Sequence, residues 1–304
     1  MNYNKPKEIV LITGVSGMIS KSVAMLLKLN NFEVRFLSRT KKASNQFVWD
    51  FSKNYIEPNA LTNVQHIIHL AGANISDKRW TKKRKKVILD SRIQSTKLLF
   101  EEVQKHQISL KTFISASAVG YYGTTTKDVI FTEESPCGND FLAQVCILWE
   151  KESDLFSTYK NTRVVKLRFG VVLDSNGGAL AKMIKPITMG IGAVLGNGKQ
   201  YIPWIHIEDL CQLLLYSLNN SNMIGSYNAV APQHITNKQL TNLLAYKLHK
   251  RIWLPKAPSF ILKLLFGEMS SIILKGNRVS CEKLLSSKFT FKYPKIDEAL
   301  DNLL

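Results

Sequence analysis

The strongest constraint on the fold is an apolar run that ends in a glycine-containing turn and leads into a helix. Residues 8–13 read EIVLIT, which is typical of a buried parallel strand. Gly14 and Gly17 follow, and SKSVAMLLKL at residues 20–29 has apolar residues at helical spacing. EVRFLSR, at residues 33–39, has the composition of a second strand. A strand, a helix and a strand within about 30 residues predict a right-handed crossover between parallel strands.

The alternation of strands and helices continues along the chain. Apolar strand-like runs occur at residues 64–72, 111–123 and 163–173, and helical patterns at 81–105 and 140–156. This order predicts an α/β fold with a Rossmann-type doubly wound parallel sheet. After Gly170 the pattern becomes glycine-rich and irregular, and residues 235–304 contain amphipathic helical stretches near 236–249, 257–275 and 280–286. We expect an NADP-binding domain at residues 1–234, with a substrate-lobe insertion at about 173–203, and a smaller, mainly helical substrate lobe at 235–304.

Composition limits the classes of partner. The chain carries a net charge of +18, which suits an anionic ligand. The densest basic run, KRWTKKRKKV at residues 78–87, has no nucleic-acid-binding motif beside it, so we expect no nucleic-acid partner. The four cysteines and six histidines show no metal-ligand spacing, and we expect no metal. We expect either a monomer or a homodimer.

Two observations bear on membranes and location. The first ten residues lack the apolar core of a signal peptide, which favours a cytoplasmic protein. The apolar segment 257–275 is interrupted by Gly267 and Glu268, so its continuous run is too short to span a bilayer. A docked helix or helix pair is therefore favoured there over a membrane anchor, and no membrane partner is expected.

The turn at residues 14–20 has the chemistry of a pyrophosphate site. Gly14 permits a tight turn after the strand, and Gly17 lets backbone amides approach phosphate at the start of the helix, where the dipole favours negative charge. The usual third glycine, which allows close packing of helix and strand, is replaced by Ser20. Serine is small, so we expect the close packing to survive.

The end of the second strand predicts which dinucleotide binds. A site for NAD usually places an acidic residue there to accept from the ribose 2′-hydroxyl. This chain has Ser38 and Arg39 instead, and a guanidinium is suited to a 2′-phosphate. The sequence therefore favours NADP(H) as the cofactor, although Arg39 could also be an ordinary surface arginine.

Several longer motifs occur in a familiar order. TGVSGMIS, FLSRT, HLAGANISDKRW, DSR, SASAVGYYG, LRFGVVLDSNGGALAKM and PWIHIEDL all lie between residues 13 and 210. With the C-terminal segment 254–300, they resemble the extended short-chain dehydrogenases/reductases, and more closely the atypical NAD(P)-dependent epimerase/dehydratase-like proteins often described as sugar-nucleotide epimerases. The resemblance covers about residues 8–304.

The resemblance implies a set of cofactor-binding residues. The phosphate loop would comprise Gly14, Ser16, Gly17, Met18 and Ile19, the 2′-phosphate site Ser38 and Arg39, and the wall beside the ribose Leu70, Ala71 and Gly72. Arg92 of DSR would face the cofactor, Ser115 and Ser117 would flank the nicotinamide, and Val172 would approach its carboxamide.

The larger superfamily uses a Tyr-x-x-x-Lys pair for proton transfer, and this chain lacks it. The corresponding place is CILWE, with Cys146 for tyrosine and Glu150 for lysine. A carboxylate there would raise rather than lower the pKa of the thiol. Ser117 and Tyr122 remain as the candidate catalytic residues, although Tyr122 could instead be a pocket wall, and His206 in WIHIEDL is a further ionisable group.

Two functions remain open from the sequence. The first is an NADP(H)-binding oxidoreductase or epimerase-like enzyme with non-standard catalytic residues, acting on a small polar or nucleotide-sugar substrate. The alternative is a non-catalytic NADPH-binding sensor or regulatory protein.

Overall fold

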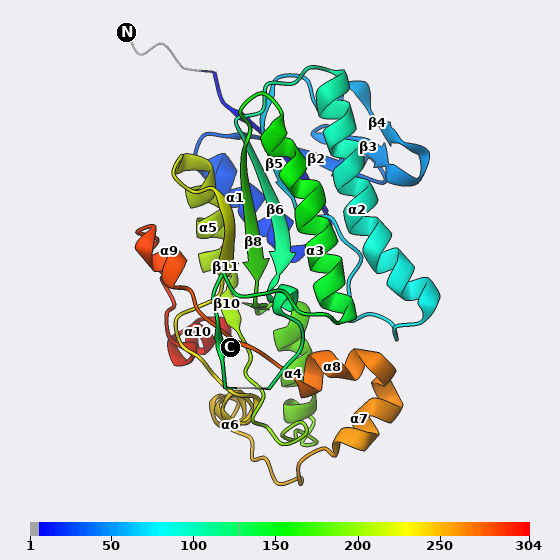
Figure 1. The fold of residues 1–304 in the computed structure, drawn as a ribbon. Helices are drawn as coiled ribbons and strands as arrows, with labels where there is room; N and C mark the ends of the chain where they lie inside the picture. Colours follow the sequence, from blue (N-terminus) through cyan, green and yellow to red (C-terminus); the bar gives the residue numbers. More distant parts are fainter. Residues whose placement is uncertain (1–5, 127) are drawn as a thin grey trace.

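The computed structural model describes residues 6–126 and 128–304, and its centre is an eight-stranded sheet (Figure 1). The strands lie in the order β11-β8-β6-β5-β1-β2-β3-β4, and every neighbouring pair is parallel except β3 and β4. Their bounds are β1 Ile9–Thr13, β2 Glu33–Ser38, β3 Gln46–Asp50, β4 Tyr55–Ile56, β5 Val64–His69, β6 Thr112–Ala118, β8 Arg163–Phe169 and β11 Gly225–Ala229. The predicted Rossmann-type doubly wound sheet is confirmed.

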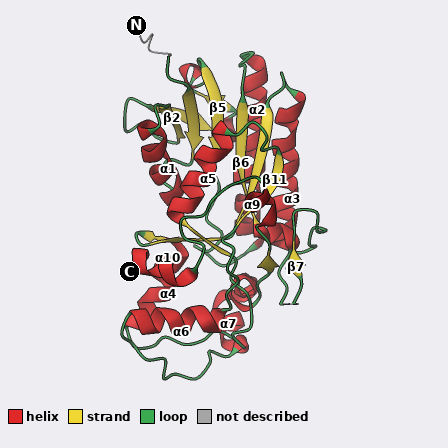
Figure 2. Ribbon diagram, turned by 90° about the vertical axis from the view of Figure 1, so that its left-hand side faces the viewer, coloured by secondary structure: helices red, strands yellow, loops and turns green. Residues whose placement is uncertain are grey.

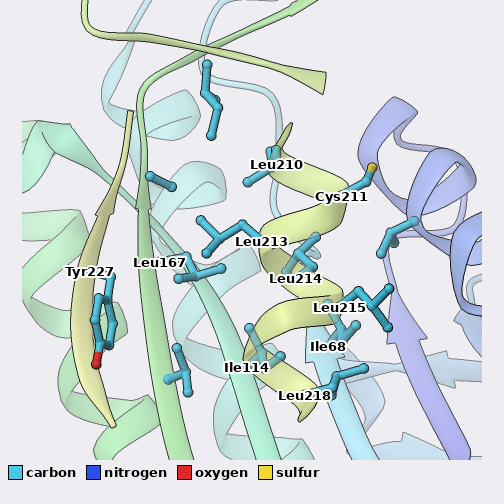
Figure 3. Close-up of a cluster of buried hydrophobic side chains, with 14 of the residues drawn as sticks. Ile68, Ile114, Leu167, Leu210, Cys211, Leu213, Leu214, Leu215, Leu218 and Tyr227 are labelled. Carbon is cyan, nitrogen blue, oxygen red and sulfur yellow. The ribbon is translucent and has the colours of Figure 1, made fainter. Parts of the chain in front are cut away.

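Helices cover both faces of this sheet. One face carries α1 (Met18–Leu29) and α5 (Ile207–Asn219), and the other carries α2 (Lys82–Lys105) and α3 (Phe141–Asp154) (Figure 2). All five residues of β1 are buried because both of its faces are covered, which explains its continuous apolar sequence. Figure 3 shows leucines of α5 lying against Ile68, Ile114 and Leu167 of three adjacent strands.

The order of the strands places a ligand edge between β1 and β5. From β1, the chain runs outward through β2 on one side, and then returns to β5 on the other side. In open α/β sheets, ligands bind at such a reversal, outside the carboxyl ends of the strands. The glycine turn at residues 14–17 lies at this edge.

A smaller lobe lies below this edge of the sheet in Figure 1. A parallel pair, β9 (Val171–Asp174) and β10 (Trp204–His206), leads into it, and it contains α4 (Gly178–Thr188), α6 (Asn237–Lys247), α7 (Ser259–Phe266), α8 (Ser271–Leu274) and α10 (Ile296–Leu303). The short helix α9 (Glu282–Ser286) packs against β11 instead. A short pair, β7 (Ile130–Phe131) and β12 (Arg278–Val279), joins the lobe to the loop after β6. One apolar cluster includes Leu180 of α4, Leu240 of α6 and Leu300 of α10. Residues of the 173–203 segment and of the 235–304 segment therefore share a core.

Some elements differ from the sequence-based expectation. Of the helix or helix pair expected at 257–275, the structure has the pair: α7 ends at Phe266, and a 3₁₀ turn at Gly267–Ser270 precedes α8. Gly267 has a φ of +60°, which favours glycine and interrupts the helix. The hairpin of β3 and β4 and the final helix α10 were not anticipated. Within the described residues, no helix is long and apolar enough to cross a bilayer.

Candidate functional site

The glycine turn leaves the start of α1 open to an anion. Gly14 has a φ of +78°, and a β-carbon there would lie 3.1 Å from the carbonyl oxygen of Leu70. The amide of Gly17 donates to the Gly14 carbonyl over 2.9 Å, which closes the turn. Gly17 is the N-cap of α1; it provides no side-chain acceptor, and the first turn contains no acidic residue. The first amides of α1 are thus available to a phosphate group.

A buried network of hydrogen bonds, which the sequence did not predict, connects the ends of β1 and β5. The Thr13 hydroxyl accepts from the amides of Leu70 and Ala71, over 3.0 and 2.9 Å, and lies 2.9 Å from Nδ1 of His69. Because two amides donate to the Thr13 hydroxyl, this hydroxyl acts as the donor in its hydrogen bond to Nδ1 of His69. His69 Nε2 then donates to the Ser95 hydroxyl, 3.2 Å away. Burial lowers the pKa of His69 to about 3, so the ring stays neutral. This hydrogen-bond network holds Leu70 against the Gly14 turn.

Ser20 occupies the position of the missing third glycine without disturbing the packing. It is buried on α1, and its hydroxyl donates to the Thr13 carbonyl over 3.3 Å. The side chain therefore satisfies its own polar group while helix and strand stay close, as expected from its small size.

The end of β2 presents a cation and no carboxylate. Ser38 is buried there, and its hydroxyl lies 3.4 Å from the amide of Thr40. Arg39 is exposed directly after the strand. Lys41, two residues further on, is bound to Glu57 over 2.9 Å.

Arg92 contacts the loop that follows β5. Its guanidinium donates to the carbonyls of Ala73 and Ile88, over 3.1 and 3.0 Å, and lies 5.1 Å from the ring centre of Trp149. A β-carbon on Gly72 would come within 2.9 Å of this guanidinium, so a larger residue there would displace the Arg92 side chain. Burial lowers the pKa of Arg92 to about 10, which still leaves it charged at neutral pH.

The remaining predicted cofactor residues take varied positions. Met18, at the start of α1, reaches α4: a β-carbon on Gly178 would lie 3.0 Å from its methyl group. Val172 is buried in β9. The buried hydroxyl of Ser115 accepts from Ser153 of α3 over 2.9 Å, so this side chain is directed toward α3.

At the place of the superfamily's lysine, the chain has a buried ion pair. Arg168 of β8 donates from Nε and Nη2 to the two carboxylate oxygens of Glu150, over 2.8 and 2.9 Å. Ser117 donates to the same carboxylate over 2.7 Å. The Tyr122 hydroxyl accepts from Arg168 over 2.9 Å and donates to Asn228 over 2.6 Å. Both candidate catalytic hydroxyls are therefore parts of one network with Glu150 and Arg168.

The charges in this network fix its protonation. Burial alone would raise the pKa of Glu150, but the hydrogen bonds and charge of Arg168 outweigh burial, and the pKa is lowered overall. Burial raises the pKa of Tyr122 to about 12. Burial, and then the charge of Glu150, raise the pKa of Cys146 to about 12. At neutral pH the site thus holds a carboxylate beside a neutral phenol and a neutral thiol.

The contacts of His206 indicate a structural role. It is fully buried, its Nδ1 accepts from the amide of Glu208 over 3.1 Å at the start of α5, and its ring centre lies 4.0 Å from that of Tyr293. Asp209 accepts from the amides of Lys292 and Tyr293. These contacts attach the C-terminal segment to α5, and burial lowers the pKa of His206.

Comparisons with known proteins identify the family of the chain. Residues 10–230 match the sequence model of the NAD dependent epimerase/dehydratase family, and residues 257–303 match a domain of unknown function, DUF1731. The epimerase family protein YfhF of Bacillus subtilis is 36% identical over 300 residues, 97% of each chain. A protein of Mycobacterium leprae, ML0860, also named an epimerase family protein, is 34% identical over 97% of this chain and 95% of its own.

Two solved structures extend the comparison. The human epimerase family protein SDR39U1, solved with NADPH, superposes with a TM-score of 0.86 and 29% identity, over 97% of this chain and 98% of its own. A protein of Corynebacterium glutamicum described as a nucleoside-diphosphate sugar epimerase gives a TM-score of 0.81 and 30% identity, over 98% of this chain and 58% of its own. On its sequence, its fold and its glycine turn, the chain belongs to the NAD dependent epimerase/dehydratase family.

Proposed function

We propose that this protein binds NADP(H) at the carboxyl ends of β1, β2 and β5, and uses it in an epimerase or oxidoreductase reaction on a small polar or nucleotide-sugar substrate. The observation that carries this proposal is the open start of α1 beside an exposed Arg39, with no carboxylate at the end of β2. The NADPH in the human relative supports the choice of cofactor. The substrate would lie between this edge and the smaller lobe. Residues 1–234 would form the cofactor domain, with a substrate-lobe insertion at about 173–203, and residues 235–304 the substrate lobe.

The residues present fit such a cofactor. The amides of Ser16, Gly17, Met18 and Ile19, after the turn at Gly14, would bind the pyrophosphate. Ser38 and Arg39 would bind the 2′-phosphate. The other proposed contacts are Leu70, Ala71, Gly72, Arg92, Ser115 and Val172. When bound, the nicotinamide supplies hydride exchange; the chain's own groups must orient the substrate and move a proton.

Ser117 and Tyr122 are the proposed catalytic residues, and the network suggests separate roles. Ser117 already donates to Glu150, so its oxygen can accept a hydrogen bond from a substrate hydroxyl while its own proton passes to the carboxylate. The Tyr122 hydroxyl accepts a hydrogen bond from Arg168, the side chain that keeps Glu150 ionised. Glu150 would then serve as the final proton acceptor in place of the missing Tyr-x-x-x-Lys pair.

Replacing Arg39 with Ala should remove the preference for NADPH. The charge-assisted bonds to a 2′-phosphate are worth roughly 1.5–3 kcal/mol, so NADPH affinity should fall about tenfold to a hundredfold, with NADH affinity unchanged. Titrating NADPH fluorescence measures this. Lys53→Ala, which removes one positive charge from an exposed site elsewhere, is the control. An unchanged preference in Arg39→Ala would show that the 2′-phosphate site is wrongly assigned.

Replacing Ser117 with Ala should lower kcat by about a hundredfold or more, the usual contribution of a positioned proton-transfer group. NADPH affinity should be unchanged, and Ser117→Thr should restore much of the rate because it keeps the hydroxyl. The assay is NADPH oxidation with the substrate that a panel of aldehydes, ketones and nucleotide sugars identifies. Full activity in Ser117→Ala would exclude the relay.

A further inference from the structure

Helix α7 presents an apolar face to solvent. Phe260 is 70% exposed, Leu264 74% and Leu265 58%, and Ile261 is also exposed. At 3.6 residues per turn, these four side chains occupy one continuous arc of the helix, and Leu262 and Phe266 lie on the side that faces the lobe. Leu262 is the only buried residue of α7. The sequence favoured a docked helix here, but the larger share of its apolar surface is unpacked.

Exposure continues into the loop that precedes α7. Trp253 is 71% exposed, and the other four tryptophans are buried. The backbone of this loop is held in place: the Ala257 amide donates to Val194 over 2.8 Å, and the Gly196 amide donates to Ala257 over 3.0 Å. Figure 1 shows α7 on the outer edge of the smaller lobe, away from the eight-stranded sheet. Contiguous exposed apolar surface of this kind marks an interaction site.

The charges around this surface indicate what covers it. Lys250, Arg251, Lys256 and Lys263 are all exposed, and residues 232–267 contain six Lys and Arg but no Asp or Glu. In a twofold dimer the same patch meets itself, which would bring these cations together. An anionic bilayer instead accepts the apolar side chains and neutralises the cations at its surface.

We propose that α7 and the loop before it, with Trp253, Phe260, Ile261, Leu264 and Leu265 as the inserting residues, bind the surface of a membrane containing anionic lipid. The helix has the composition of interfacial helices, with Phe, Ile and Leu on one side and Lys263 at the flank, and Trp253 lies in the loop before it. It is only eight residues long, so it lies in the interface and does not span the bilayer. This peripheral contact departs from the expected absence of a membrane partner, and it is independent of the proposed function.

Flotation of the full chain with vesicles tests this proposal. The protein should bind vesicles of equal parts phosphatidylcholine and phosphatidylglycerol, and bind phosphatidylcholine alone much more weakly. The double variant Phe260→Glu/Leu264→Glu should lose at least about tenfold in affinity, because it replaces two apolar side chains that would insert into the bilayer. The matched control is Met25→Glu/Leu29→Glu, whose side chains are 65% and 85% exposed, also one turn apart, on α1. The control should bind like the parent, and NADPH binding should be retained in both variants.

Two further measurements separate lipid insertion from other causes of vesicle binding. Lys256→Glu/Lys263→Glu should weaken binding by about fivefold or more per charge, whereas Lys28→Glu/Lys53→Glu, with the same change in net charge, should have a smaller effect. Trp253 emission should shift to the blue on binding to vesicles. Equal loss in the patch and control variants would mean that net charge alone drives binding, and would overturn the proposal. So would absence of vesicle binding, or a dimer in sedimentation velocity that Phe260→Glu/Leu264→Glu converts to a monomer.

Discussion

Replacing Arg168 with Met is expected to lower the free energy of unfolding by about 3–5 kcal/mol, the usual cost of removing one partner of a buried ion pair. Lys166, whose Nζ lies 3.9 Å from the Glu150 carboxylate, remains in the variant and places the expected cost toward the lower end of this range. The side chains of Arg168 and Glu150 are 4% and 7% exposed, so water cannot take the place of the guanidinium. Methionine approaches the length of the arginine stem, which limits the cavity that the substitution leaves. Urea unfolding followed by circular dichroism measures the effect.

Two controls separate the ion pair from packing. The double variant Glu150→Met/Arg168→Met removes both charges and should recover most of the lost stability. Lys97→Met removes one partner of the exposed Lys97–Glu101 pair and should cost less than about 1 kcal/mol. A double variant less stable than Arg168→Met would contradict the account, because it would make packing the cause.

The effect of Arg168→Met should depend on pH with a definite sign. In the parent, the pKa of Glu150 is lowered, so the pair contributes stability above the unfolded-state pKa of a glutamate, about 4.3, and loses it as the pH falls through the folded-state value. In the variant, a protonated Glu150 needs no partner. The difference in the free energy of unfolding between parent and variant should therefore become smaller from pH 7 toward pH 3. A difference that grows over this range would contradict the explanation.

The second large effect is expected from Gly17→Asp, which should weaken dinucleotide binding strongly, while its helix cap offsets the close contact of its β-carbon with the Gly14 carbonyl oxygen. Gly17 is the N-cap of α1 and has an extended backbone, with φ −70° and ψ 147°, that any residue can adopt. Aspartate is a favoured N-cap and would bond the first amides of the helix. It would thereby occupy the groups proposed to bind pyrophosphate and place a negative charge there. NADPH affinity should fall by at least about a hundredfold, since bonds to charged groups are worth roughly 1.5–3 kcal/mol each.

Gly17→Asn is the matched control for size. Both side chains add a β-carbon 3.2 Å from the Gly14 carbonyl oxygen, and both can cap the helix, but only aspartate is charged. The asparagine variant should bind NADPH more tightly than the aspartate variant, and thermal unfolding should place both near the parent. Unchanged NADPH binding in Gly17→Asp would show that the start of α1 is not the phosphate site.

Local patterns in the sequence were sufficient to predict the sheet and the glycine turn at its edge. The run at 8–13, the glycines at 14 and 17 and the alternation of later elements depend on neighbours within a few residues. The hairpin of β3 and β4 was missed because its strands are short and its turn at Asn54, with a φ of +49°, carries no glycine. Helix α10 was also missed, although acidic residues in its first turn and the spacing of Ile296, Leu300 and Leu303 were a signal.

The polar networks could not be predicted, because their members are distant in the chain. Thr13 and His69 are 56 residues apart, and Ser117 and Glu150 are 33 apart. The sequence indicated that Glu150 would raise the pKa of Cys146, which the structure confirms, but gave no sign that Arg168 on β8 would bind that carboxylate. The catalytic assignment of Ser117 and Tyr122 stays a prediction for the same reason: their roles depend on partners that only the fold brings together.

The most direct test of the central claim is isothermal titration calorimetry of the full chain with NADPH and with NADH. The account predicts heat of binding with NADPH, a dissociation constant at or below about 10 µM, and an affinity for NADH at least about tenfold weaker. No heat with either dinucleotide, or equal affinity for both, would contradict it.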